Sequence, residues 1–72
     1  MAKTPFTNTI RRLRFEADEM TQAELGAKVG VTRQTIAAIE QGKYSPTLET
    51  AFRIARTFNQ PLEAVFAWDE GA

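Results

Sequence analysis

Residues 20–46 read MTQAELGAKVGVTRQTIAAIEQGKYSP, and this stretch decides the fold. Thr21 is followed three residues later by Glu24, which is the pattern of a capping box. In such a box, each of the two side chains binds a free backbone amide at the start of a helix. The helix that begins here is predicted to end at Gly30, because glycine adopts the left-handed C-cap conformation at little cost. Local chemistry therefore marks both ends of this helix.

A second helix signal follows directly after that glycine. Thr32 is the expected N-cap, the helix runs to about Gln41, and Gly42 ends it. The joint Gly30-Val31-Thr32 between two short amphipathic helices is very tight. This spacing is typical of a helix-turn-helix, in which the two helices cross at a steep angle.

Outward from this unit, the flanking segments predict three further helices and no strand. Asn8 is the expected N-cap of a first helix. Thr47 caps a fourth helix, which ends near Asn59 because asparagine tolerates the left-handed conformation. A short last helix runs from about Pro61 to Ala67, and we expect the tail of residues 68–72 to fray. The expected fold class is all-α.

Apolar residues at helical spacing define the expected core. In chain order they are Ile10, Leu13, Ala17, Leu25, Val29, Ile36, Ile39, Leu48, Ala51, Phe52, Ala55, Phe58, Leu62, Val65 and Phe66. The chain of 72 residues is expected to be one domain, with a core over about residues 8–67, a short N-terminal arm and a C-terminal tail. A domain with so small a core and without disulfides or a structural metal is only marginally stable. We therefore expect a second subunit to stabilise it.

Composition excludes several classes of protein. The chain has no Cys and no His, which removes disulfides, the usual zinc ligands, the thiol nucleophile and the commonest general base. We therefore expect no metal, no cofactor and no enzyme activity, and no small-molecule ligand is evident. No apolar window approaches a membrane span and the first residues lack the apolar core of a signal peptide, so we expect a cytoplasmic protein. The nine basic and nine acidic residues cancel to a net charge of +0.

The outward face of the helix at 32–41 carries the chemistry that points to a function. Its small alanines allow close approach to a surface, while Arg33 and Gln34 supply forked donors and acceptors at the first turn. Arg suits the O6/N7 edge of guanine and Gln the N6/N7 edge of adenine, both in the major groove. The alternative interpretation is an ordinary solvated helix face.

Groups that suit phosphate surround this helix. Thr21 and Gln22 lie in the first turn of the preceding helix, beside exposed amides at the positive end of its dipole. Lys43, Tyr44 and Ser45 follow the helix and give three more phosphate-binding groups. Together these residues surround one helix with the backbone contacts that a groove-inserted helix requires.

The stretch 20–46 resembles the helix-turn-helix of the phage-repressor/Cro (XRE-like) family, and the likeness extends over about residues 8–66. The resemblance implies a lambda-repressor-like domain of five helices that binds double-stranded operator DNA as a homodimer and regulates transcription as a repressor. It implies base-edge contacts at Thr32, Arg33, Gln34 and Ala38, and backbone contacts at Gln22, Lys43, Tyr44 and Ser45. It also pairs Arg14 with Glu40.

The sequence departs from the family's pattern at several positions. The segment from Arg14 to Met20 is one residue longer than the commonest pattern, and Pro61 stands where a capping serine is usual. Ala38 removes one hydrogen-bonding side chain from the reading face. Gly26 replaces a frequent alanine, and we interpret it as a packing position.

Two further expectations concern partners. The dimer interface is expected at Leu62, Val65, Phe66 and Trp68, which gather apolar side chains at the C-terminal end, and the operator is expected to be an inverted repeat. Two other functions remain open: the DNA-binding antitoxin of a toxin–antitoxin pair, and a helical protein-interaction module that does not bind DNA.

Overall fold

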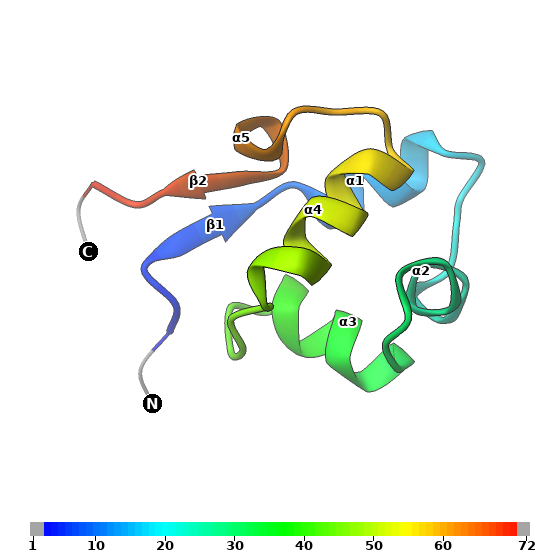
Figure 1. Ribbon diagram of the computed structural model, residues 1–72, viewed down its shortest axis with the longest axis horizontal. Helices are drawn as coiled ribbons and strands as arrows, with labels where there is room; N and C mark the ends of the chain where they lie inside the picture. Colours follow the sequence, from blue (N-terminus) through cyan, green and yellow to red (C-terminus); the bar gives the residue numbers. More distant parts are fainter. Residues whose placement is uncertain (1–2, 71–72) are drawn as a thin grey trace.

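The computed structural model describes residues 3–70, which fold into five α-helices and one two-stranded antiparallel sheet (Figure 1). In chain order the elements are β1 (Phe6–Asn8), α1 (Ile10–Glu16), α2 (Gln22–Val29), α3 (Arg33–Glu40), α4 (Leu48–Thr57), α5 (Leu62–Val65) and β2 (Phe66–Trp68). Within these residues, no helix has the length and apolar character needed to cross a bilayer.

The helix-turn-helix is formed by α2 and α3, and its predicted caps are confirmed. The Glu24 N–H donates to Thr21 Oγ1 at 3.0 Å, and the Thr21 N–H donates to the Glu24 carboxylate at 2.8 Å. Gly30 ends α2 with a φ of 83°, and the Thr32 side chain caps α3. In Figure 1, α2 is seen almost end-on while α3 runs across the view, so the two helices cross steeply.

The core lies between the helices and is entirely apolar among the described residues. Its buried members are Ile10, Leu13, Leu25, Val29, Ile36, Ile39, Ala51, Ile54, Ala55 and Val65. Most of the predicted core positions are therefore confirmed, and they come from all five helices.

The prediction of which α4 residues are buried is partly wrong. Leu48 is 67% exposed and Phe52 is 48% exposed, whereas Ile54 is fully buried. The buried stripe of α4 runs through Ala51, Ile54 and Ala55, at the i, i+3, i+4 spacing of a helix face. Two small alanines on this stripe let α4 approach the core closely, and they turn the larger Leu48 and Phe52 outward.

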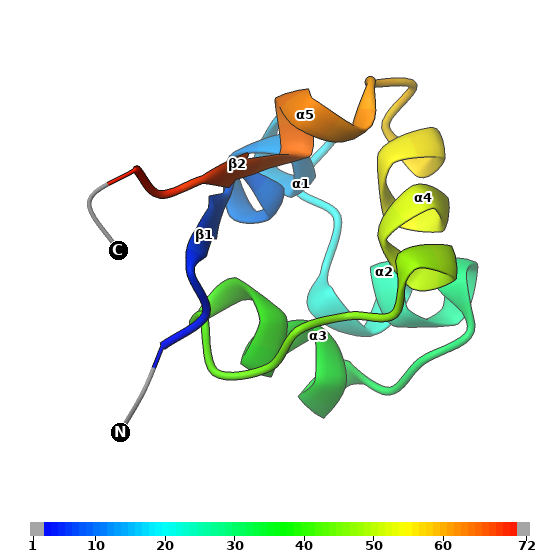
Figure 2. The same ribbon diagram turned by 60° about the vertical axis from the view of Figure 1, so that its left-hand side comes forward.

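The sheet corrects the all-α prediction. β1 and β2 come from opposite ends of the described chain and lie side by side (Figures 1 and 2), with Thr7 paired to Ala67. The ladder continues beyond both strands, because the Thr9 N–H donates to Val65 O and the Asp69 N–H donates to Pro5 O, each at 2.9 Å. Residues 66–69, which were expected to form the end of the last helix and part of a fraying tail, are thus tied to the N-terminal arm. Residues 71–72 of the expected tail lie outside the described residues.

The last helix ends earlier than predicted, at Val65 in place of Ala67. Phe66 has extended backbone angles, with φ −122° and ψ 130°. Its ring packs edge-to-face on Phe6 with the centroids 5.8 Å apart. Pairing with β1 and this aromatic contact replace the last turn of the helix.

The predicted N-cap of α1 is wrong by one residue. Asn8 lies in β1, and Thr9 is the N-cap residue, without a side-chain cap bond. The Asn8 side chain connects two elements: its Oδ1 accepts from the Ile10 N–H at 3.2 Å and its Nδ2 donates to Ile39 O at 3.1 Å. Asn8 therefore links the start of α1 to the end of α3.

The loop between α1 and α2 accommodates the additional residue of this chain. Asp18 and Glu19 both have positive φ, 61° and 55°. This left-handed pair reverses the chain so that the Met20 N–H donates back to Arg14 O at 2.9 Å. The longer segment is thus absorbed in a compact turn, and Arg14 keeps its place at the end of α1.

Candidate nucleic-acid interface

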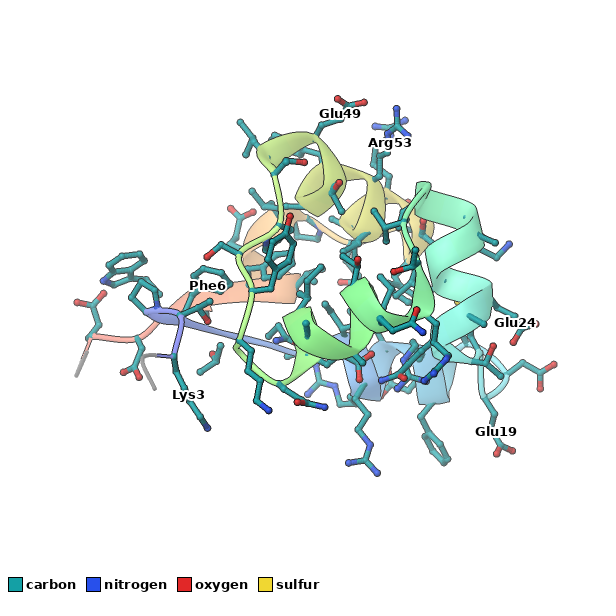
Figure 3. All side chains as sticks on the ribbon, turned by 90° about the horizontal axis from the view of Figure 1, so that it is seen from below. Lys3, Phe6, Glu19, Glu24, Glu49 and Arg53 are labelled. Atoms are coloured by element: carbon teal, nitrogen blue, oxygen red, sulfur yellow. The ribbon has the colours of Figure 1, made fainter. Side chains whose placement is uncertain are left out.

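The outward face of α3 is the surface that the sequence predicts to read DNA. Ile36 and Ile39 are fully buried and hold the opposite face of the helix against the core. Arg33 and Gln34 are exposed at the first turn, and Gln41 is exposed after the last. Figure 3, seen from below, shows α3 uncovered by any other element on this side. The remaining predicted base contacts are less prominent: Thr32 is exposed but caps α3, and Ala38 is half-buried.

An ion pair fixes α3 to α1. Arg14 Nε donates to Glu40 Oε2 at 2.7 Å, and Arg14 Nη2 donates to Glu40 Oε1 at 3.1 Å. The third donor, Arg14 Nη1, binds Met20 O at 2.8 Å. The two side chains are only 15% and 9% exposed. This forked pair locks the C-terminal end of α3 to α1 and to the loop that precedes α2.

Gln22 joins the same network. Its Nε2 donates to Glu40 Oε1 at 3.2 Å, and the residue is half-buried. One amide hydrogen and the amide oxygen are left for another partner, so a phosphate contact at Gln22 stays a prediction. The hydroxyl of Thr21 serves the capping box, and any phosphate contact there must share that oxygen.

The predicted backbone contacts after α3 lie on one exposed turn. Gly42 has a φ of 73°, and the Lys43 N–H donates to Ala38 O at 2.9 Å. The chain therefore leaves α3 sharply, with Lys43, Tyr44 and Ser45 all exposed. These side chains stand at the C-terminal end of α3, at the opposite end from Arg33.

A hollow of about 490 Å³ opens between the end of α1, the start of α2 and Arg33. Sequence reasoning missed two of the residues that line it, Arg11 and Phe15. Phe15 is 70% exposed. The signal that was available is the i, i+3 spacing of Arg11 and Arg14 on one helix, which places both on the same face.

The residues expected at a dimer interface do not share one environment. Val65 is 1% exposed and belongs to the core of its own chain, whereas Trp68 is 64% exposed. Leu62 and Phe66 are half-buried and line a groove of about 260 Å³. The other residues that line this groove are Phe6, Pro46, Leu48 and Ala51. A contact with a second copy would therefore rest on Leu62, Phe66 and Trp68, without Val65.

Among residues 3–70, a clear pKa shift is found at the capping box. The backbone N–H of Thr21, which binds the Glu24 carboxylate, lowers the pKa of Glu24 below its usual value, and the Thr21 side chain and the charge of Lys28 act in the same direction. Among residues 3–70, no group of three or more His, Cys, Asp or Glu side chains is arranged to hold a metal ion.

Comparison with known proteins agrees with this geometry. Residues 10–65 match the family model described as Helix-turn-helix, which covers the whole helical part of the fold. The chain belongs to the XRE-type helix-turn-helix family. This is a family of DNA-binding transcriptional regulators and not of enzymes.

The curated relatives carry names of the same kind. An uncharacterised HTH-type transcriptional regulator of Archaeoglobus fulgidus is 53% identical over 51 residues, which is 71% of this chain and 72% of that protein. The HTH-type regulator YgzD of Bacillus subtilis is 44% identical over 63 residues, 88% of this chain and 94% of that protein. The cryptic phage CTXphi transcriptional repressor RstR of Vibrio cholerae is 39% identical over 57 residues, 79% of this chain and 50% of that protein.

Proposed function

We propose that this helix-turn-helix protein is a sequence-specific repressor that inserts α3 into the major groove of operator DNA. The exposed pair Arg33 and Gln34 at the first turn of α3 carries this proposal. Recognition helices meet base edges with their N-terminal residues. Arg33 would read a guanine and Gln34 an adenine, because these side chains match the O6/N7 and N6/N7 edges of those bases.

The proposed active form is a homodimer. Trp68 is exposed and pairs in the sheet with Phe6, which lines an apolar groove. A chain of 72 residues also has only a small core to stabilise a single subunit. A two-fold dimer would read two inverted half-sites whose centres lie about one DNA turn apart, roughly 10 base pairs. Leu62, Phe66 and Trp68 are the proposed contact residues, and sedimentation at micromolar concentration tests this state directly.

The reading residues are tested by selecting bound sequences from a random DNA pool, first with the parent protein and then with variants. Arg33→Ala is expected to cost about 1–3 kcal/mol of binding free energy and to relax the preference for one base pair per half-site. Gln34→Ala should act in the same way at a neighbouring position. Both side chains are exposed, so the melting of each variant should stay within about 0.5 kcal/mol of the parent.

Arg53→Ala is the matched control for charge. Arg53 is an exposed arginine of α4 that pairs with Glu49, and it points away from α3 in Figure 3. Its loss should leave affinity and base preference at parental values, because Arg53 is turned away from α3. Stability should also change little, because exposed ion pairs contribute little to it. If Arg33→Ala behaves like Arg53→Ala, α3 is not the reading helix. A parent protein that binds no DNA even at low salt would instead favour the protein-interaction alternative.

A further inference from the structure

The hydrogen bonds of the terminal sheet determine which backbone groups of β2 point away from β1. The Thr9 N–H donates to Val65 O, and the Asp69 N–H donates to Pro5 O. In an antiparallel pair, residues that exchange backbone bonds alternate with residues that do not. The bonded residues here all have odd numbers, so the backbone N–H and C=O of Trp68 point to the outer edge of β2.

Most of the backbone groups on this outer edge have no partner within residues 3–70. The Phe66 N–H is used at the end of α5, where it donates to Leu62 O. By contrast, the Phe66 C=O and both backbone groups of Trp68 form no hydrogen bond in the described part of the chain. Beyond β2, Figures 1 and 2 show no further element alongside the strand except α5, from which it continues. β2 is therefore an open edge strand.

The opposite edge of the sheet is covered by the end of α3. The Thr4 hydroxyl donates to Phe6 O at 3.1 Å, and the Thr4 N–H donates to Gly42 O at 2.8 Å. Asn8 Nδ2 donates to Ile39 O at 3.1 Å. Since β1 lies between β2 and these contacts, the open edge of β2 faces away from the end of α3. A chain that pairs with β2 would leave the proposed reading surface uncovered.

The charges that flank the open edge have one sign. Residues 61–70 include Glu63, Asp69 and Glu70 and no Lys or Arg. Glu63 precedes β2 and Glu70 follows it, and both are exposed without an ion pair to any residue of the described range 3–70. A second copy of β2 would bring the same acids to this edge, and like charges on neighbouring strands are destabilising. The edge therefore favours a strand from a different protein, with basic residues at its ends.

The side chains beside the edge are apolar. Phe66 and Trp68 lie two residues apart on β2, so they project from the same face of the sheet. Trp68 is 64% exposed, and Phe66 lines the apolar groove together with Leu62 and Leu48. Every second side chain of an added strand would lie on this face, where apolar residues would pack against Phe66 and Trp68.

We propose that the outer edge of β2 is a docking site for an extended peptide segment of a partner protein, which adds to the sheet as a third strand. The segment has apolar residues at alternate positions and a Lys or Arg near each end. Its backbone accepts from the Trp68 N–H and donates to the C=O groups of Trp68 and Phe66, while its basic ends lie near Glu63 and Glu70. Such strand addition takes affinity from backbone bonds and specificity from alternate side chains.

This edge is distinct from the two surfaces of the proposed function. Backbone groups of a strand point along the plane of the sheet, whereas the side chains that border the apolar groove project out of that plane. The reading residues Arg33 and Gln34 belong to α3, from which the edge faces away. The protein would therefore bind the partner segment and DNA at the same time.

The first test uses a short synthetic peptide of alternating Val and Thr with a Lys at each end. The control is the same peptide with a Glu at each end. Hydrogen exchange of the Trp68 amide is followed by NMR in the full chain. At saturation the Lys-ended peptide should slow this exchange about tenfold, because the amide enters a backbone hydrogen bond. The Glu-ended peptide should bind about fivefold more weakly, because its charges face Glu63 and Glu70.

Trp68→Pro and Trp68→Val form a matched pair of variants. Both remove the indole ring, but only proline also removes the backbone N–H. The fold should accept this proline, because an edge strand tolerates proline where the N–H faces solvent. Trp68→Pro should bind the Lys-ended peptide about tenfold more weakly than Trp68→Val, since one backbone bond is lost and its acceptor is left unpaired. If the proline variant does not fold, exchange at Trp68 in the parent decides the question.

Several results would overturn the site. They are no binding of the Lys-ended peptide, binding that leaves exchange at Trp68 unchanged, equal affinity for the two peptides, and equal binding by Trp68→Pro and Trp68→Val. A Trp68 amide that is protected without peptide and exchanges faster on dilution would show that a second copy occupies the edge. None of these results changes the test of DNA reading through Arg33 and Gln34, so the two proposals can fail separately.

Discussion

The helix-turn-helix and the terminal sheet are stabilised in opposite ways. In the segment from Thr21 to Gly42, the interactions that define each helix lie within one or two turns of the chain: a capping box, a threonine cap and two left-handed glycines. In the terminal region, Thr7 pairs with Ala67 and Phe6 packs on Phe66, so each partner comes from the other end of the chain. The first unit therefore forms from local signals, whereas the second exists only once the fold has brought both ends together.

This contrast has a functional side. The helix-turn-helix carries the proposed reading residues on helices that local caps define, and Glu40 holds these helices to α1. The terminal sheet carries no proposed DNA contact, and its aromatic residues border the groove proposed to contact a second copy. Substitutions in the helix-turn-helix should therefore impair DNA recognition, whereas substitutions in the terminal sheet should impair dimer formation.

The largest expected effect comes from removing the Glu40 carboxylate, which holds α3 to α1. Glu40→Ala leaves the mostly buried Arg14 guanidinium and the Gln22 amide without their common acceptor. We expect a loss of about 3 kcal/mol in the free energy of unfolding by urea, near the lower end for removing one partner of a buried ion pair. DNA binding should fall with it, because the end of α3 is released.

Glu49→Ala is the control for that variant. The pair of Glu49 with Arg53 is exposed, so its loss should change stability by less than about 0.5 kcal/mol. If Glu40→Ala unfolds at the same urea concentration as Glu49→Ala, the stability of the helix-turn-helix does not depend on the Arg14–Glu40 pair. The proposed contrast with the terminal sheet would then be contradicted.

A substitution in the terminal sheet should cost less stability than Glu40→Ala. Phe66 is half-buried and packs on Phe6, so Phe66→Ala is expected to cost about 2 kcal/mol, below the usual range for a fully buried phenylalanine. The variant should shift the dimer toward monomer in sedimentation while the base preference of α3 stays parental. An altered base preference in Phe66→Ala would show that the sheet does influence the reading face.

The smallest expected effect concerns the capping box. Because the folded pKa of Glu24 lies below its unfolded value, its stabilising contribution is present above the unfolded pKa and is lost as pH falls through the folded pKa. Glu24→Gln keeps an acceptor for the Thr21 N–H but does not titrate. The difference in stability between the parent and Glu24→Gln should therefore shrink as the solution is acidified below about pH 4.5. A difference that stays constant in acid would contradict a carboxylate cap.

The candidate interface was only partly predictable from sequence. The exposed position of Arg33 and Gln34 was predictable, because their place in the first turn of a capped helix follows from local spacing. Arg11 and Phe15 were missed because the direction of their side chains depends on how α1 meets α2. That meeting is set by the left-handed pair Asp18 and Glu19, which no local signal marked.

The sequence by itself determined the helix-turn-helix: where α2 and α3 begin and end, which faces of them are apolar, and the family to which the chain belongs. A cap acts on amides three residues away, and a glycine acts on its own backbone, so both can be read from a short window. Only the tertiary structure decided that Asn8 and Phe66 lie in strands and that Phe52 faces solvent while Ile54 is buried. These outcomes depend on contacts between distant segments, such as Thr7 and Ala67, which are 60 residues apart, and on the competition among apolar faces for one small core. Pairing and packing of that kind outweigh local helix preference, because they take effect only when the whole chain is folded.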